Sequence, residues 1–197
     1  VGSGTGRFTK KIVKSFTNAT FYLIEPDKEC IIKLRDIFSH NKNIIINQNN
    51  AEDMNFAIKF DIICMATSFH HIPYVNKSNV VEKISHLLKS DGIFIMCDNF
   101  VADYSNENER VQVLIEYHDK WIKDSIKDKN KKGEEMARKM KKLVMMKNGG
   151  EYFTSPEKFE DIIKNGNLIT IKKINVTNFK LKEDGNKYVY IMKHDKN

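Results

Sequence analysis

The sequence lacks any apolar run long enough to cross a membrane, and its start does not pair a charged segment with an apolar stretch and a cleavage site. We therefore expect a cytoplasmic protein with no membrane span; a leader ahead of Val1 would lie outside this sequence.

Cysteine is also scarce. Cys30, Cys64 and Cys97 are odd in number and widely spaced, and two of them lie in apolar segments. This pattern favours reduced core residues over disulfides or metal ligands.

Proline and glycine are too few to form a flexible linker, with three prolines and nine glycines in 197 residues. The length suits one domain, so we expect a single domain over residues 1–197.

The formal net charge of +7 raises the question of a polyanionic partner. Most of the excess is lysine and comes with abundant asparagine and isoleucine, a bias that an AT-rich genome would produce. We therefore favour a solvated basic surface, with nucleic acid as a weaker possibility.

Short apolar runs alternate with amphipathic segments in the first half of the chain. Buried strands are predicted at 21–24, 44–46, 61–65 and 93–97, and helices at 7–16, 28–38 and 77–88. Nearly continuous apolar runs are typical of strands covered on both faces. The fold class is therefore α/β, with a doubly wound, mostly parallel sheet.

The alternation stops after Asp98. Residues from about 105 to 146 have helical periodicity, which predicts a helical cap inserted in the domain over 105–147. Ser155 followed by Pro156 indicates the start of another helix. Two strands are predicted at 169–178 and 187–192, and Asp184-Gly185 between them favours an antiparallel hairpin.

The stretch VGSGTGRFT at the start contains Gly2, Gly4 and Gly6. Such a loop allows a ligand to approach the backbone, and the following helix offers free N–H groups. About twenty residues later Glu25 ends a predicted strand, where an acid can accept hydrogen bonds from ribose hydroxyls. Nicotinamide enzymes have G-x-G-x-x-G at this place, whereas this chain has G-x-G-x-G with Arg7 in the position of the last glycine.

Five segments together resemble, in order and spacing, the class I S-adenosylmethionine-dependent methyltransferases, especially the branch acting on small molecules: VGSGTGRFT, FYLIEPD, NNAEDMNF, FDIICMATSFHHI and HLLKSDGIFIMCD. The resemblance covers roughly residues 1–98. It implies a Rossmann-like methyltransferase sheet and S-adenosyl-L-methionine as cofactor. It also implies a central strand before the glycine loop, so we expect that sequence precedes Val1 in the full protein.

The resemblance further assigns cofactor contacts. Gly2, Ser3 and Gly4 would pack against the methionine part, Glu25 would hold the ribose, and Pro26 would lie near the adenine. Asn50-Ala51 stands where the family usually has Asp-Ala; the Asn50 carbonyl can accept from the adenine amino group but carries no charge. Met65, Ala66 and Thr67 would line the floor beneath the sulfonium.

Methyl transfer requires an oriented acceptor, exclusion of water, and a base where the acceptor is a weak acid. His70 and His71 follow the predicted strand at 61–65 and are candidates for that base. Asp98 is a candidate for orienting the acceptor. Asp98-Asn99 is similar to a catechol-type magnesium site, but Ala66-Thr67-Ser68 supplies no further acid, so we expect no metal.

The cap is expected to form a lid over the ligand-binding edge of the sheet, with Tyr117, His118 and Trp121 walling the acceptor pocket. We predict a methyltransferase acting on a small organic acceptor. Two alternatives stay open: a tRNA-modifying enzyme similar to the wobble-uridine carboxymethyl synthases, and a non-catalytic S-adenosylmethionine-binding module. The sequence contains neither the base-methylating Asn/Asp-Pro-Pro-aromatic segment nor aromatics interleaved with the basic runs.

Overall fold

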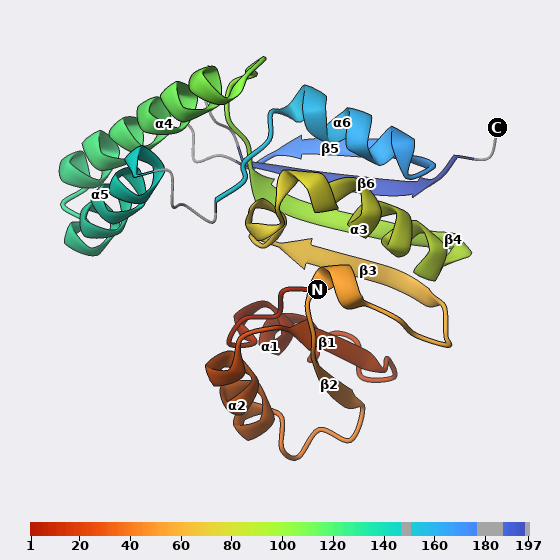
Figure 1. Ribbon diagram of the computed structural model, residues 1–197. Coiled ribbons are helices and arrows are strands. Elements are labelled where there is room, and N and C mark those ends of the chain that lie inside the picture. Colours follow the sequence, from red (N-terminus) through yellow and green to blue (C-terminus); the bar gives the residue numbers. More distant parts are fainter. Residues whose placement is uncertain (147–150, 177–186, 196–197) are drawn as a thin grey trace.

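The computed structural model describes residues 1–146, 151–176 and 187–195. Its first half alternates helices and strands (Figure 1). In chain order these are α1 Arg7–Ile12, β1 Phe21–Glu25, α2 Lys28–Ile37, β2 Ile44–Gln48, η1 Ala51–Asp53, β3 Phe60–Ala66, η2 Phe69–His71, α3 Tyr74–Leu87 and β4 Leu88–Asn99. The second half consists of α4 Glu107–Lys127, α5 Lys131–Met145, α6 Pro156–Asn165, β5 Leu168–Asn175 and β6 Lys187–His194.

The strands form a parallel pair, β1-β2, and a four-stranded sheet in the order β3-β4-β6-β5. β3 is parallel to β4, whereas β6 is antiparallel to both of its neighbours. The predicted mostly parallel α/β sheet with a terminal antiparallel pair is therefore confirmed. The Asp184-Gly185 turn lies outside the described residues.

The first residues of the chain lie between the two sheets. The amino group of Val1 donates to the carbonyl of Cys64 in β3 at 2.7 Å, and the Ser3 N–H donates to the carbonyl of Ile24 in β1 at 3.0 Å. The glycine loop is thereby attached to both β1 and β3.

Local capping explains where several helices begin. Asp27 accepts from the Cys30 N–H at 2.7 Å and starts α2, and Ser155 accepts from the Lys158 N–H at 3.2 Å with Pro156 in the first turn of α6. A side-chain oxygen at the N-cap satisfies an N–H group that has no partner within the helix. α3 begins at Tyr74, three residues earlier than predicted, because Pro73 stands at its N-cap.

The main core lies between the four-stranded sheet and the helices α3 and α6, which cover the same face of it (Figure 1). Val80, Val81 and Ile84 of α3 pack with Phe94 and Met96 of β4, and all five side chains are fully buried. A smaller cluster joins α2 to β1 and β2. These two clusters hold fixed the strand ends on which the candidate site is built.

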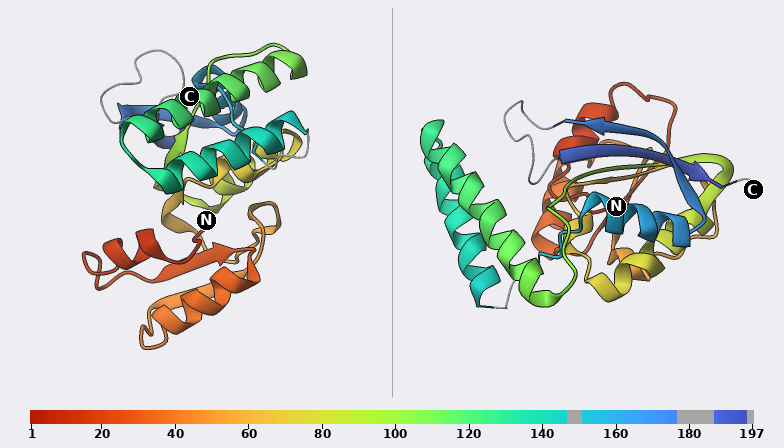
Figure 2. Two further views of the ribbon diagram at one scale, coloured as in Figure 1. Left: turned by 90° about the vertical axis from the view of Figure 1, so that its left-hand side faces the viewer. Right: turned by 90° about the horizontal axis from the view of Figure 1, so that it is seen from above.

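Helices α4 and α5 pack against each other and project away from the sheet (Figures 1 and 2). The helical cap therefore exists as a two-helix hairpin, with the break at 128–130, just before Lys131. Asn130 caps α5 by accepting from the Gly133 N–H at 3.0 Å. A third apolar cluster, which contains Val101, Leu114 and Phe153, attaches the hairpin to the segments that lead into and out of it.

Candidate functional site

The glycine loop has a backbone that only glycine adopts easily. Gly2, Gly4 and Gly6 have φ angles of 67°, 51° and 78°. A Cβ at Gly2 would lie 2.4 Å from the Cβ of Ser68, whereas a Cβ at Gly4 would meet no atom within 4 Å. Gly2 is therefore required by packing as well as by its backbone conformation. Gly4 borders open space, and its missing side chain leaves backbone accessible to a ligand.

Glu25 holds this loop in place. One oxygen of its carboxylate accepts from the Gly4 N–H at 2.6 Å and the other accepts from the Asp27 N–H at 3.1 Å. The side chain is almost fully buried. A carboxylate offers about four acceptor positions, so these two bonds leave capacity for hydroxyl donors at the same edge.

The other predicted cofactor contacts lie on the neighbouring segments. Asn50 is exposed and its Nδ2 donates to Asp53 at 3.0 Å, while Pro26 is exposed directly after β1. Met65 is buried in the main core. Thr67 follows β3 with a φ of 55° and donates its N–H to the Cys97 carbonyl at 2.7 Å. Contact of these residues with a cofactor stays a prediction.

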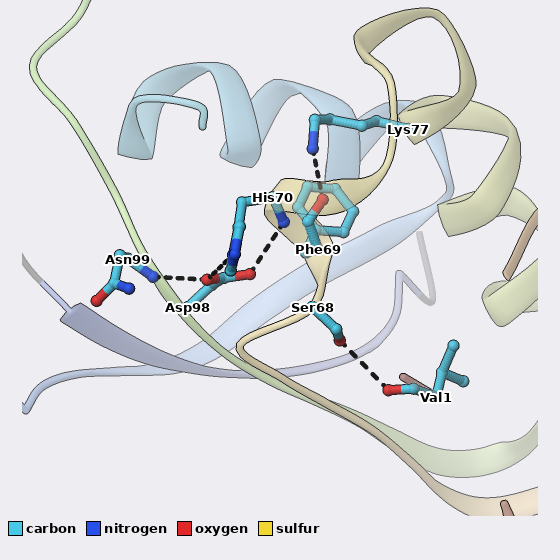
Figure 3. A network of polar contacts seen from close by, with 7 residues as sticks. All are labelled: Val1, Ser68, Phe69, His70, Lys77, Asp98 and Asn99. Carbon is cyan, nitrogen blue, oxygen red and sulfur yellow. Dashed lines mark hydrogen bonds and ion pairs between the residues drawn. The ribbon is translucent and has the colours of Figure 1, made fainter. Parts of the chain in front are cut away.

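His70 and Asp98 form a buried pair at the ends of adjacent parallel strands (Figure 3). Nδ1 of His70 lies 2.7 Å from Oδ1 of Asp98, and the His70 N–H donates to Oδ2 at 3.1 Å. Oδ1 also accepts from the Asn99 N–H at 2.8 Å. Because an ionised carboxylate only accepts, Nδ1 carries the proton in this contact, and a neutral ring then has its lone pair on Nε2.

The return segment from the cap, residues 151–154, packs onto His70. The ring of Phe153 stacks on the imidazole with centroids 4.7 Å apart and an interplanar angle of 11°, and the Tyr152 N–H donates to the His70 carbonyl at 2.6 Å. Two phenols, Tyr74 and Tyr104, donate to the Phe153 carbonyl at 2.6 and 3.0 Å. His71 lies beside His70, with ring centroids 4.0 Å apart.

The predicted cap residues differ in their placement. Tyr117 packs against Phe153, and burial raises the pKa of its phenol, with the charges of Glu151 and Asp98 adding to the effect. His118 is fully buried; its Nδ1 donates to the Leu114 carbonyl at 2.6 Å and its Nε2 lies 3.3 Å from Glu151. Trp121 is half-buried near His118. Tyr117 therefore connects the cap to the His70 region, and contact of the three with an acceptor stays a prediction.

Sequence reasoning missed three residues of this region: Lys77, Glu151 and Phe153. Lys77 was assigned only to the start of a helix, yet its side chain is fully buried and Nζ donates to the Phe69 carbonyl at 2.6 Å. Phe153 lies in a segment with no helical or strand periodicity, so no pattern marked it. A lysine directly among apolar helix positions, as in Lys77 to Val81, is a weak signal that is more typical of an exposed turn.

No group of three or more His, Cys, Asp or Glu side chains suits a metal ion within the described ranges. No described helix has both the length and the apolar character that crossing a membrane requires. An open depression at the opposite edge of the sheet, beside the start of β4, is lined by Ser85, His86, Leu88 and His194 and includes none of the predicted site residues.

A family model described as "Methyltransferase domain" matches residues 1–94, from the glycine loop to the middle of β4. This match ends just short of the midpoint of the 197-residue chain, so the first part of the chain is similar to the methyltransferase domain family. An uncharacterized methyltransferase of Staphylococcus carnosus (strain TM300) is 26% identical over 118 residues, which are 60% of this chain and 52% of that protein. The chain thus matches about half the length of this relative.

Solved structures share the fold of this chain. An S-adenosylmethionine-dependent methyltransferase from Clostridium acetobutylicum ATCC 824 superposes with a TM-score of 0.64 at 14% identity, covering 98% of this chain and 81% of that one. The mycolic acid cyclopropane synthase complexed with SAH and CTAB gives 0.63 at 13% identity, covering 89% and 55%. At these identities the likeness concerns the fold. The cap helices α4 and α5 lie beyond the family match, as do Asp98 and Phe153, whereas His70 lies within it.

Proposed function

We propose that this methyltransferase domain binds S-adenosyl-L-methionine and transfers its methyl group to a small organic acceptor. The proposal depends on one juxtaposition: the glycine loop, held by Glu25 at the end of β1, is joined to the His70–Asp98 region because Ser68 donates to the carbonyl of Val1 at 3.3 Å. In open α/β sheets, ligands bind outside the carboxyl ends of the strands. Solved structures of this fold in complex with SAM or SAH support the choice of cofactor.

The residues around Gly4 fit such a cofactor. Open space beside Gly4 gives room for a chain to pass close to the backbone, and the spare acceptor capacity of Glu25 suits the paired hydroxyls of a ribose. Gly2, Ser3 and Gly4 would hold the methionine part, with Asn50 and Ala51 beside the adenine. When bound, the cofactor supplies an electrophilic methyl group on a sulfonium.

His70 is proposed to act as the general base. Its Nδ1–H is donated to Asp98, so Nε2 takes the proton that the acceptor loses. Asp98 is almost fully buried and three N–H groups converge on it, so it acts by fixing the tautomer and orientation of His70. We therefore propose that Asp98 acts through His70 and does not itself orient the acceptor. His71 and Tyr117 would position the acceptor.

A small acceptor is favoured by the surroundings of His70. Phe153 stacks on its ring, the His71 ring lies beside it at an angle of 53°, and the residue is only 7% exposed. The hairpin of α4 and α5 stands at the end of the sheet where β3 ends (Figure 1). A site this enclosed suits a metabolite better than a base within a folded nucleic acid. A solved structure of the same fold, that of the mitomycin 7-O-methyltransferase MmcR, supports a small-molecule acceptor.

The experiment measures transfer of a labelled methyl group. Methyl-tritiated S-adenosylmethionine is incubated with the protein and a protein-free extract of small metabolites, and products are identified by mass spectrometry. Label in a small molecule, lost in His70→Gln while S-adenosylhomocysteine binding persists, supports the proposal. Calorimetric binding of NAD in place of S-adenosylhomocysteine would overturn the cofactor assignment, and full transfer by His70→Gln would overturn the base.

A further inference from the structure

Lys77 is buried to a degree that is unusual for a lysine near the start of a helix. Its side chain is fully buried at the first turn of α3, and Nζ lies 4.1 Å above the ring centre of Phe69. Burying an ammonium group is costly unless it is compensated. Within the described ranges no carboxylate oxygen lies within ion-pair distance of Nζ, and its hydrogen bond goes to the main-chain carbonyl of Phe69. That carbonyl belongs to the peptide group that leads into His70.

One peptide group is therefore held at both ends by charged residues (Figure 3). Its carbonyl oxygen, on Phe69, accepts from Lys77 at 2.6 Å, and its N–H, on His70, donates to Asp98 at 3.1 Å. A carbonyl that accepts from a cation strengthens the donor at the other end of the same peptide, because the two bonds polarise the group in one direction. Lys77 thereby acts on the contact that orients His70.

The electrostatic surroundings support this coupling. Burial lowers the pKa of the Lys77 ammonium to about 7, opposed by the charges of Asp98 on β4 and Glu52 on η1. Tyr74 also faces Nζ, with its ring centre 5.7 Å away. The charge of Lys77 thus partly balances the buried Asp98 carboxylate, which accepts from N–H groups of His70 and Asn99.

We propose that Lys77 is a positioning residue for His70, holding the Phe69–His70 peptide so that Asp98 fixes the imidazole. The catalytic consequence rests on the proposed function of His70, whereas the effect on the peptide does not. A purely structural role, tying α3 to η2, predicts a general loss of stability. A positioning role predicts a local change at the His70 amide and a loss of methyl transfer without a loss of cofactor affinity.

The test compares Lys77→Met with Lys83→Met. Lys83 lies on the same helix and also donates to a main-chain carbonyl, that of Glu52, but has no contact with the Phe69–His70 peptide. We measure amide hydrogen exchange by NMR, taking the rate at His70 relative to that at Met96 in the core of β4. Lys77→Met should speed exchange at His70 about tenfold beyond any change at Met96, and Lys83→Met should not. Parallel changes at His70 and Met96 would overturn the proposal.

Two further measurements keep the inference separate from the proposed function. In the tritium assay with saturating S-adenosylmethionine, Lys77→Met should lose at least about tenfold in rate, with S-adenosylhomocysteine affinity within about threefold of wild type. If His70→Gln is inactive but Lys77→Met keeps its rate, the Lys77 inference alone fails. If His70→Gln is fully active, the base assignment fails, and local exchange at His70 still decides the structural part.

The wild-type chain provides an independent check if Lys77→Met does not fold. The Cε signal of Lys77 and the carbonyl carbon of Phe69 are followed together by NMR across pH 5–9. The two signals should change with one common midpoint, because deprotonation of Lys77 weakens the hydrogen bond at that oxygen. A Phe69 carbonyl signal that does not follow Lys77 would overturn the proposal.

Discussion

The imidazole of His70 is bonded through Nδ1 to the carboxylate of Asp98 at 2.7 Å, across 28 positions of the sequence. Parallel pairing of β3 with β4 brings the two together, because Ala66 is opposite Cys97 and the chain continues from each into the same region. A histidine fixed by a buried carboxylate is a typical arrangement of a general base. The pair lies near the glycine loop, since Ser68, two residues before His70, donates to the carbonyl of Val1.

Replacing Asp98 should impair catalysis without abolishing cofactor binding. In Asp98→Asn the side-chain amide can donate to His70, which favours the wrong tautomer and removes the charge that stabilises the imidazolium. We expect at least about a hundredfold loss of methyl-transfer rate, by analogy with tautomer defects in other His–carboxylate pairs, with S-adenosylhomocysteine affinity nearly unchanged. Asp91→Asn, at an exposed position of β4, is the control. Normal activity of Asp98→Asn would rule out this role of Asp98.

Glu25 should determine cofactor affinity. Glu25→Ala removes the acceptor for the Gly4 N–H and for the ribose, a charge-assisted interaction of about 1.5–3 kcal/mol. Calorimetry with S-adenosylhomocysteine should therefore show affinity lower by roughly 10- to 150-fold. Glu29→Ala, an exposed acid in the first turn of α2, should bind like wild type. Equal affinities for the two variants would remove Glu25 from the site.

Two glycine substitutions should separate binding from folding. Gly4→Ala places a methyl group in the open space beside the loop, so it should abolish most S-adenosylhomocysteine binding at the cost of about 1 kcal/mol of stability from the left-handed backbone. Gly2→Ala drives the methyl group against Ser68 at 2.4 Å and should lower the melting temperature markedly more. Thermal unfolding and calorimetry of both variants check this contrast. Unimpaired binding by Gly4→Ala would show that the cofactor passes elsewhere.

Lys77 should make the stability of the fold depend on pH. Its pKa falls from 10.5, the value for an unfolded chain, to about 7 in the fold, so between these values the unfolded chain binds one more proton. Stability should therefore rise with pH across that window, by at most about 1.4 kcal/mol per pH unit from this group. Urea unfolding at pH 7.5, 8.5 and 9.5 should show this rise in wild type relative to Lys77→Met. Identical slopes for the two proteins would show that Lys77 titrates normally.

The basic surface should not confer tight RNA binding. Most of the lysines of α5 lie on its exposed side, where attraction to phosphates is screened by salt. Filter binding with tRNA should give weak affinity that disappears near 150 mM salt, a concentration at which the Debye length is about 8 Å. Tight binding that persists at this ionic strength would favour a tRNA-modifying enzyme over a small-molecule methyltransferase.

Much of the fold could be predicted from the sequence because its signals are local. The four apolar runs, the amphipathic helix at 28–38 and the Ser155-Pro156 start of α6 correspond to elements in the structure. The glycine loop and Glu25 are signals of the same kind, since backbone freedom at Gly4 and an acid at a strand end need no knowledge of distant residues. The direct bond from the Gly4 N–H to Glu25 then followed from the fold.

The rest was decided by tertiary structure, because it consists of contacts between segments with no pattern of their own. His70 and Asp98 were recognised separately by the ends of their strands, but only strand register joins them into a pair. Phe153 and Lys77 carry no periodic signal; one stacks on His70 and the other is buried against Phe69. The sequence by itself determined the α/β fold and the glycine loop that we propose binds the cofactor. Only the packing of three distant segments around one imidazole singled out His70 as the residue that we propose takes a proton.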